Sequence, residues 1–232
     1  MTEIRTNFDP KTNGFQFTNR FPGGAVVAEL ARQDRLSELT GLKVPRAVRN
    51  LTDLASGAGF WGTFGLCGGM SSGALARFKH GEPVPVTRSI PEPDSELFRE
   101  LVRRQAETLQ GRKVLERCLA WQLSPDRAST WMFWTKGIAW LTTEREWPRL
   151  RAALQGGSPT LLCLLRVRGV GSPADNHQVV AVGADIAADG KVLVHMYDPN
   201  HPRAAPTFTL DTRNRTVGPR QSTGEPVRGF FV

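Results

Sequence analysis

Three residues that lie far apart in the chain, Cys67, His177 and Asp198, are of the types that together make a nucleophilic thiol. Cys67 lies in "FGLCGGMSSGALARF", where it directly precedes two glycines and a segment with helical apolar spacing. A thiol at a helix N-terminus has a lowered pKa, and a neighbouring imidazolium lowers that pKa further. Taken alone, a Cys before two glycines is more often a small buried residue near a tight turn. The case for chemistry therefore depends on whether a His and a carboxylate reach Cys67.

The stretch "NHQVVAVGADIAADGKVLVHMYDPNHP", residues 176–202, predicts a β-hairpin with "AADG" as its turn. If the turn centres on the middle of "AADG", Val179 faces Asp198 and His177 faces Asn200. Directly opposed residues of an antiparallel pair share a face, so these side chains are expected on one side of the sheet, at one end. A carboxylate beside His177 would fix the ring tautomer and leave the other ring nitrogen for the thiol. A slip of one residue would separate them, so the prediction depends on the turn.

The remaining His and Cys residues have simpler structural interpretations. His195 falls on the opposite face of the predicted hairpin, and His201 follows the second strand in a loop. His80 closes the helix that follows "LCGG", where the helix dipole favours its charged form. Cys118 lies in an amphipathic segment and Cys163 in an apolar run, so both are predicted to be buried packing residues.

In this order, "GLCGGM", "NHQVV" and "YDPNHP" resemble the papain-like cysteine peptidase superfamily, in particular bacterial members allied to the bacteriocin-processing (double-glycine leader) peptidases. The resemblance implies that Cys67 is the nucleophile, His177 the general base and Asp198 the carboxylate that orients the ring. It also implies an α+β fold in which an N-terminal helical lobe, carrying the nucleophile helix, packs against a C-terminal antiparallel β-sheet lobe. No cofactor is implied. The order of elements extends the similarity over about residues 60–202.

The chain departs from the family pattern at the oxyanion hole. Many members place a Gln shortly before the Cys, and the matching position here is Trp61. The backbone N–H of Cys67 offers one donor to a developing oxyanion. The second donor stays open among the indole N–H of Trp61, the hydroxyl of Thr63 and the side chain of Asn200.

The elements that must position these residues are helices first and strands afterwards, which predicts an α+β architecture. In the N-terminal half, apolar spacing and breakers predict an irregular arm with strand-like Phe15 and Phe17 (1–24), a helix (25–34), loops with one short helix (40–63), the helix that starts at Cys67 (67–79), and a long amphipathic segment capped by Asp94 or Ser95 and interrupted at Gly111 (91–119).

The C-terminal half begins with a tryptophan cluster, Trp121, Trp131, Trp134 and Trp140, which favours a core over an aromatic cleft wall. Thr143 and Glu146 then fit a capping box, for a helix that ends near Gly156. The apolar run "TLLCLLRV" has the length of a strand, and the final "GFFV" is expected to dock back on the body. Three segments of one catalytic unit are expected: an N-terminal arm with helices (1–59), a helical lobe carrying Cys67 (60–157), and a sheet lobe carrying His177 and Asp198 (158–232).

Composition excludes several classes of protein. With 232 residues, 40% hydrophobic and 22% charged, the chain can bury a sizeable core and is neither disordered nor membrane-like. No run approaches the roughly 20 apolar residues of a membrane helix, and the N-terminus lacks an apolar signal core. The default compartment is therefore the cytoplasm, with secretion as an effector, without a cleavable signal, as the alternative. Three cysteines without a CxxC pair and four scattered His residues predict no structural metal.

The chain carries a formal net charge of +8, with arginines gathered in residues 99–117 and in the tail. Two interpretations are open: a solvated helix face, or a surface for an anionic partner. The first is favoured because no base-reading motif or stacking platform accompanies the charge. The expected partner is a peptide or protein substrate, and a nucleic acid is not expected.

These observations predict a cysteine hydrolase that cleaves an amide bond, in a peptide or an isopeptide, through an acyl-enzyme on Cys67. Three alternatives stay open. The first is an acyltransferase, in which an amine or alcohol resolves the same acyl-enzyme. The second is a toxin-like effector, and the third is a non-catalytic binding module with a basic surface on the same fold.

Overall fold

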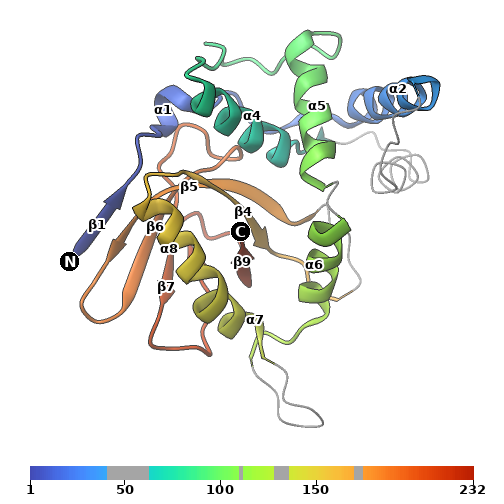
Figure 1. Ribbon diagram of the computed structural model, residues 1–232. Helices are drawn as coiled ribbons and strands as arrows, with labels where there is room; N and C mark the ends of the chain where they lie inside the picture. Colours follow the sequence, from blue (N-terminus) through green and yellow to red (C-terminus); the bar gives the residue numbers. More distant parts are fainter. Residues whose placement is uncertain (41–62, 110–111, 128–135, 170–174) are drawn as a thin grey trace.

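A computed structural model describes residues 1–40, 63–109, 112–127, 136–169 and 175–232 of the protein (Figure 1). Its elements are, in chain order, β1 (Thr2–Arg5), α1 (Pro10–Asn13), β2 (Phe21–Pro22), α2 (Gly23–Thr40), β3 (Thr63–Phe64), α4 (Cys67–His80), α5 (Glu96–Leu109), α6 (Arg112–Leu123), α7 (Ile138–Trp140), the π-helix η1 (Leu141–Glu146), α8 (Trp147–Gln155), β4 (Thr160–Leu165), β5 (His177–Ile186), β6 (Lys191–Tyr197), β7 (Thr207–Asp211), β8 (Arg220–Gln221) and β9 (Gly229–Phe231). The short helix expected within 40–63 lies outside the described residues, and so do Trp61, Trp131 and Trp134.

A curled antiparallel sheet of seven strands forms the centre of the fold (Figure 1). The strands follow the order β8-β7-β6-β5-β4-β9, and β1 pairs with β5 outside this path. Two strands share one edge of β5, because β4 pairs with its first half, from His177 to Ala181, and β1 with its second half, from Gly183 to Ile186. The predicted α+β architecture is confirmed, and a strand from the N-terminal arm completes the sheet that carries His177.

Alternate residues of β5 face different helices. Val180 and Val182 belong to a core shared with α4, α5 and the N-terminal arm, whereas Val179 and Ala181 pack in a second core with α8. This alternation is what the pleat of a strand produces when both of its faces are buried. The sheet therefore has helices on both faces, and α4, which begins with Cys67, covers the first of them (Figure 1).

The N-terminal arm contributes aromatic rings to the first core, although it does not form the strand expected around Phe15 and Phe17. Both side chains are fully buried, and their ring centroids lie 5.4 Å apart. The carbonyl of Phe15 also accepts a hydrogen bond from the buried Tyr197 hydroxyl at 3.3 Å. The alternation of apolar residues in the arm thus reflects insertion into the core, without pairing to a neighbouring strand.

A third, smaller core lies between α6, α7 and the strands β4 and β9. It buries Cys118, Trp121, Cys163 and Phe231. The two sulfur atoms of Cys118 and Cys163 lie 3.9 Å apart. The packing role predicted for both cysteines is confirmed, and Trp121 is a core residue. The predicted docking of "GFFV" is also confirmed, since Phe231 pairs with Cys163 in the sheet.

The capping box predicted at Thr143 and Glu146 is wrong, because the helix has already begun at Ile138 and passes through η1 into α8. Glu146 is fully buried and forms an ion pair with Arg117 of α6, so its carboxylate serves tertiary packing and not a helix end. In a regular α-helix the ring of Pro148 would clash with the carbonyl four residues earlier. The wider π turn directly before it accommodates the ring.

The long amphipathic segment predicted for 91–119 consists of two helices, α5 and α6, with the break at residues 110–111. Ser95 caps α5, since its hydroxyl oxygen accepts the backbone N–H of Phe98 at 3.2 Å. Several arginines of α5 and of the C-terminal tail are held in ion pairs: Arg103 with Glu107, Arg104 with Glu100, Arg215 with Glu144, and Arg228 with Asp126. No helix in the described part of the chain is long and apolar enough to cross a membrane.

Candidate active site

Cys67 is the first residue of α4, and the two glycines after it explain how the helix start is packed. A Cβ atom on Gly69 would lie 2.1 Å from the carbonyl oxygen of Leu101 in α5, and one on Gly68 would lie 2.4 Å from Oγ1 of Thr108. Neither distance is compatible with a side chain. The glycines therefore let the N-terminus of α4 press directly against α5, which buries Cys67 at the helix end.

Side-chain amides from elsewhere in the chain satisfy N–H groups at the start of α4. The Gly69 N–H donates to Oε1 of Gln105 at 3.0 Å, and the Leu66 N–H donates to Oδ1 of Asn19 at 2.5 Å. The Cys67 N–H belongs to the first turn of the helix, where N–H groups have no acceptor within the helix. Together with the positive end of the helix dipole, such N–H groups favour negative charge at this end of α4.

The hairpin of β5 and β6 brings the other two residues together. Val180 pairs with Tyr197 and Ala181 with Met196, the register that the sequence predicted at the end of the hairpin near His177. Nearer the turn the pairing is offset by one residue, because Gly183 faces His195, and the register shifts between Ala181 and Gly183. The predicted pairing is therefore one residue off in the half of the hairpin next to the turn, and a β-bulge restores the predicted register before the strands reach the site.

His177 and Asp198 form a buried pair at this end of the hairpin. The Nε2–H of His177 donates to Oδ1 of Asp198 at 2.6 Å, and both side chains are almost wholly buried. Two further donors hold the carboxylate: the backbone N–H of Asn200 at 2.8 Å to Oδ1, and Nε2 of Gln221 at 3.1 Å to Oδ2. Because Asp198 occupies Nε2, Nδ1 is the ring nitrogen left for the thiol.

The protonation equilibria of the three groups favour a thiolate–imidazolium pair. Burial would raise the pKa of Cys67, but hydrogen bonding to His177, the charge of that ring, and the backbone N–H groups of Gln178 and Gly68 outweigh burial and lower it. Burial would lower the pKa of His177, but hydrogen bonds to Asp198 and Cys67 raise it to about 9. Burial likewise opposes the charge of Asp198, and its bond to His177 keeps its pKa below the ordinary value. The thiol pKa is thus shifted down and the imidazole pKa up, the directions that a nucleophilic cysteine and a neighbouring base require.

Of the three candidates for the second oxyanion donor, the structure places only one in detail. Trp61 lies outside the described residues. Thr63 lies in β3, where its backbone pairs with Pro22, and its side chain is not described. Asn200 is part of the site: its backbone N–H binds Asp198, and its Oδ1 accepts a hydrogen bond from Nδ2 of Asn19 at 2.9 Å.

Four residues of the site carry no signal that sequence analysis could use: Asn19, Gln105, Gln178 and Gln221. Each acts through a contact far along the chain, and an isolated amide in an arm, helix or strand looks the same whether it is structural or functional. Asn19 has the most informative position, because it bonds both to the residue before Cys67 and to the turn after Asp198. The hydrogen bonds thus connect the two sides of the site through Asn19 as well as through His177.

Of the other histidines, His195 and His80 lie away from the site, whereas His201 lies close to Asp198. His195 forms its own pair with Asp185 at 2.8 Å. Asp185 lies eight residues after His177 in β5, which separates the two positions by roughly 26 Å at 3.3 Å per strand residue. His80 donates from Nδ1 to the carbonyl of Ala76 at the C-terminal end of α4. His201 lies in the turn after Asp198.

One group of side chains, Asp198, His201 and Glu225, places three metal-binding atoms within 4.8 Å of one another. Protein donors already occupy its oxygens. Nε2 of Gln221 bridges the two carboxylates, and Arg166 binds Glu225 at 3.0 Å. The cluster is therefore explained as a network that holds Asp198 in place.

Compared with protein-family models, with curated proteins and with solved structures, the chain has no significant match. The assignment of a function therefore depends on the chemistry of the site itself.

Proposed function

We propose that the protein is a papain-like cysteine hydrolase that cleaves an amide bond, in a peptide or an isopeptide, through Cys67, His177 and Asp198. One observation carries the proposal: the imidazole of His177 lies between a buried thiol at the first residue of α4 and a buried carboxylate 2.6 Å from its Nε2. The packing of α4 against an antiparallel sheet whose strand ends carry the base and the carboxylate supports the papain-like arrangement.

In the first half of the reaction, the thiolate of Cys67 attacks the carbonyl carbon of the amide. A C–S bond forms, and the carbonyl electrons move to oxygen, beside the N–H at the start of α4. When the tetrahedral intermediate collapses, the C–N bond breaks and the leaving amine takes the proton of the His177 imidazolium. The products of this step are a free amine and a thioester on Cys67.

In the second half, water resolves the thioester. Neutral His177 accepts a proton from the water as its oxygen attacks the acyl carbon. The C–S bond then breaks, which releases a carboxylic acid and restores the thiolate–imidazolium pair. Asp198 holds the ring in one tautomer through both halves and stabilises its charged form.

The test compares hydrolysis of peptides, followed by mass spectrometry, for the wild type and matched variants. Cys67→Ala and His177→Ala are expected to lower the rate at least roughly 10⁴-fold. His195→Ala removes the other His–Asp pair of the same hairpin and is expected to leave the rate unchanged. In the native protein, iodoacetamide should modify Cys67 first, and Cys163 should react far more slowly because Cys118 and burial raise the pKa of its thiol. Modification of Cys118 or Cys163 alone would overturn the proposal.

The alternatives are separated by the same assay. An amine added as acceptor would appear in the product if the protein is an acyltransferase. A binding module with a basic surface would show salt-dependent binding that Cys67→Ala does not change. The ion pairs that hold many of the arginines weigh against this last alternative.

A further inference from the structure

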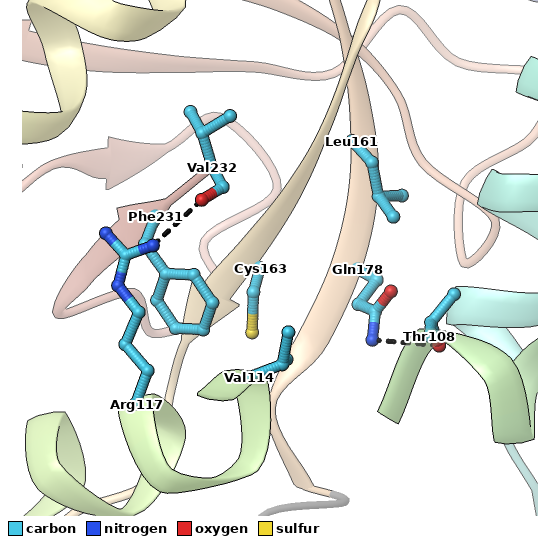
Figure 2. Close-up of a pocket in the computed structure, with 8 residues that line it drawn as sticks. All are labelled: Thr108, Val114, Arg117, Leu161, Cys163, Gln178, Phe231 and Val232. Atoms are coloured by element: carbon cyan, nitrogen blue, oxygen red, sulfur yellow. Dashed lines mark hydrogen bonds between the residues drawn. The ribbon is translucent and has the colours of Figure 1, made fainter. Parts of the chain in front are cut away.

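A small pocket lies between the end of α5, α6, the strands β4 and β5, and the C-terminal strand (Figure 2). Its volume is about 160 Å³, and the residues that line it are Thr108, Val114, Arg117, Leu161, Cys163, Gln178, Phe231 and Val232. These residues come from both sides of the site, because α5 packs against the nucleophile helix and β5 carries the base.

Gln178 connects this pocket to the thiol. Its backbone N–H bonds to the sulfur of Cys67, while its side chain lines the pocket and donates to Thr108 at 3.2 Å (Figure 2). Gly68 forms the boundary between them, because a Cβ atom there would lie 2.4 Å from Thr108 and 2.9 Å from Oε1 of Gln178. Gln178 therefore contacts the thiol through its backbone and the pocket through its side chain.

The residues that line the pocket favour binding of an uncharged group. Val114, Leu161, Cys163 and Phe231 present apolar surface, and no Asp or Glu side chain is among the described residues that line the pocket. Among the described lining residues, Arg117 carries the one charged side chain, and its guanidinium is already engaged: it lies 4.5 Å from the centre of the Phe231 ring, binds the Val232 carbonyl, and pairs with a buried glutamate. A cationic guest would meet this charge, and an anionic guest would have to displace the glutamate.

The size and polarity of the pocket limit further which group it can bind. An apolar cavity of about 150 Å³ in another protein holds one benzene ring, so this pocket can take one branched aliphatic or aromatic side chain. The Oε1 of Gln178 is buried and accepts no hydrogen bond from the described residues. A peptide residue brings both matching features, an apolar side chain and a backbone N–H donor.

We propose that this pocket, lined by Val114, Leu161, Cys163, Gln178 and Phe231, binds an apolar side chain of a peptide substrate next to the bond that Cys67 attacks. This inference rests on the proposed hydrolase function and adds the class of substrate. It makes Val114 and its neighbours specificity-determining residues.

The test uses dipeptidyl acyloxymethyl ketones, in which a thiolate displaces the carboxylate leaving group and forms a thioether. One set varies the residue next to the ketone and a second set the residue before it, each with Leu, Phe, Ala, Lys or Glu. The rate of modification of Cys67 is followed by mass spectrometry. At one of the two positions, Leu or Phe is expected to react roughly 10- to 200-fold faster than Lys or Glu.

Two variants of one position make the assignment specific. Val114→Phe narrows the pocket and should slow the preferred probe roughly 10- to 200-fold, while the Ala probe keeps its rate. Val114→Ala widens it and should shift the preference from Leu towards Phe. Leu119→Phe is the matched control, because Leu119 lies on the same helix and is 40% exposed. It should change none of the rates.

The two proposals fail in different ways. If the probes modify Cys67 with no preference for apolar side chains, or if Val114→Phe slows all probes equally, the pocket assignment is overturned and the hydrolase proposal stands. If no probe modifies Cys67, or if His177→Ala does not slow the modification, the hydrolase proposal falls, and the pocket assignment falls with it.

Discussion

The hydroxyl of Ser71 donates a hydrogen bond to the backbone carbonyl of Gln178 at 3.0 Å, and this bond fixes the helix that begins with Cys67 to the strand that begins with His177. Ser71 is fully buried one helical turn after Cys67, so it lies on the same face of α4. Gln178 directly follows His177 and also bonds to the thiol through its backbone N–H. The hydrogen bond between Ser71 and Gln178 therefore sets how closely Cys67 and His177 can approach each other.

Replacing Ser71 by Ala is expected to loosen this connection. The carbonyl of Gln178 would stay buried without its donor, which costs about 1–3 kcal/mol of the free energy of unfolding. Alkylation of Cys67 by iodoacetamide should slow in the folded variant, because the thiol loses part of its bond to the ring. Ser72→Ala is the control, since the Ser72 hydroxyl bonds only within its own helix, to Gly69. Equal unfolding free energies for the two variants would contradict this role.

The pH dependence of the thiol provides a second prediction. The pKa of Cys67 is lowered and that of His177 is raised to about 9, so the ion pair exists from below the ordinary thiol pKa of roughly 8.5 up to about pH 9. The rate of alkylation should therefore reach its plateau well below pH 8.5. Hydrolysis should decline as His177 loses its proton near pH 9, because the leaving amine then lacks its acid.

His177→Ala supplies the control for this profile. Without the imidazolium, burial acts on Cys67 with less opposition, so the midpoint of the alkylation profile should move upward. His195→Ala should leave it in place. A wild-type midpoint near 8.5, unchanged by His177→Ala, would show that the ring does not act on the thiol.

The main features of this site could be predicted from sequence because they follow local rules. The helix starts where a Cys precedes two glycines, and the hairpin has a recognisable turn with β-branched strands on each side. The predicted pairing of His177 and Asp198 nevertheless depended on two errors that cancelled. The strands next to the turn pair one residue away from the expected register, and the bulge between Ala181 and Gly183 restores that register near the site. A bulge depends on how the strand bends over its core, which no local pattern reports.

The amides around the site could not be predicted for a related reason. Asn19 acts across the fold, on Leu66 and on Asn200, and its own neighbourhood in the arm is irregular. The capping box at Thr143 failed in the same way, because Glu146 has a tertiary partner in Arg117 that outweighs the local pattern. Both features depend on partners far along the chain, which the residues next to Asn19 and Thr143 do not reveal.

Asn19 itself supports a third prediction. Asn19→Ala removes the acceptor of the Leu66 N–H and the donor to Asn200. Leu66 directly precedes Cys67, and Asn200 lies two residues after Asp198. We expect a loss of about 1–3 kcal/mol in the free energy of unfolding, together with slower alkylation of Cys67. Asn214→Ala, in an exposed turn where the side chain serves only Thr216, is the control. Wild-type alkylation kinetics in Asn19→Ala would rule out a positioning role.

The ion pair between Arg77 of α4 and Glu100 of α5 predicts how the stability of the protein changes at acidic pH. Burial opposes the charge of Glu100, but hydrogen bonds from Arg77 and Arg104 lower its pKa from 4.5 to about 2. A carboxyl whose pKa is lower in the folded state contributes stability that is fully present above its unfolded pKa and is lost as the pH falls through its folded pKa. The contribution of Glu100 should therefore be present above about pH 5 and disappear towards pH 2.

Urea unfolding of wild type and Glu100→Gln at several pH values measures this contribution. The wild type should be more stable at pH 6, and the difference should shrink as the pH approaches 2. Glu107→Gln breaks only the more exposed pair with Arg103 and should show a much smaller difference. A difference for Glu100→Gln that stays constant with pH would mean that its charge is not what joins the two helices.

The buried carboxylate of Glu146 supports a last prediction, which concerns the pocket wall. It is fully buried in η1, pairs with Arg117 of α6, and accepts the backbone N–H of Val232 at 3.1 Å. Removing one partner of a buried ion pair leaves the other charge uncompensated, so Glu146→Gln should lower the free energy of unfolding by about 3–5 kcal/mol. Glu144→Gln breaks a more exposed ion pair with Arg215. It should lower the free energy of unfolding by less than about 1 kcal/mol. Arg117 also lines the proposed substrate pocket, and in Glu146→Gln its charge is no longer paired with a carboxylate. This variant should therefore react faster with the Glu probe, relative to the Leu probe, than the wild type does. Equal stabilities of Glu146→Gln and Glu144→Gln, with an unchanged probe preference, would contradict this role of Glu146.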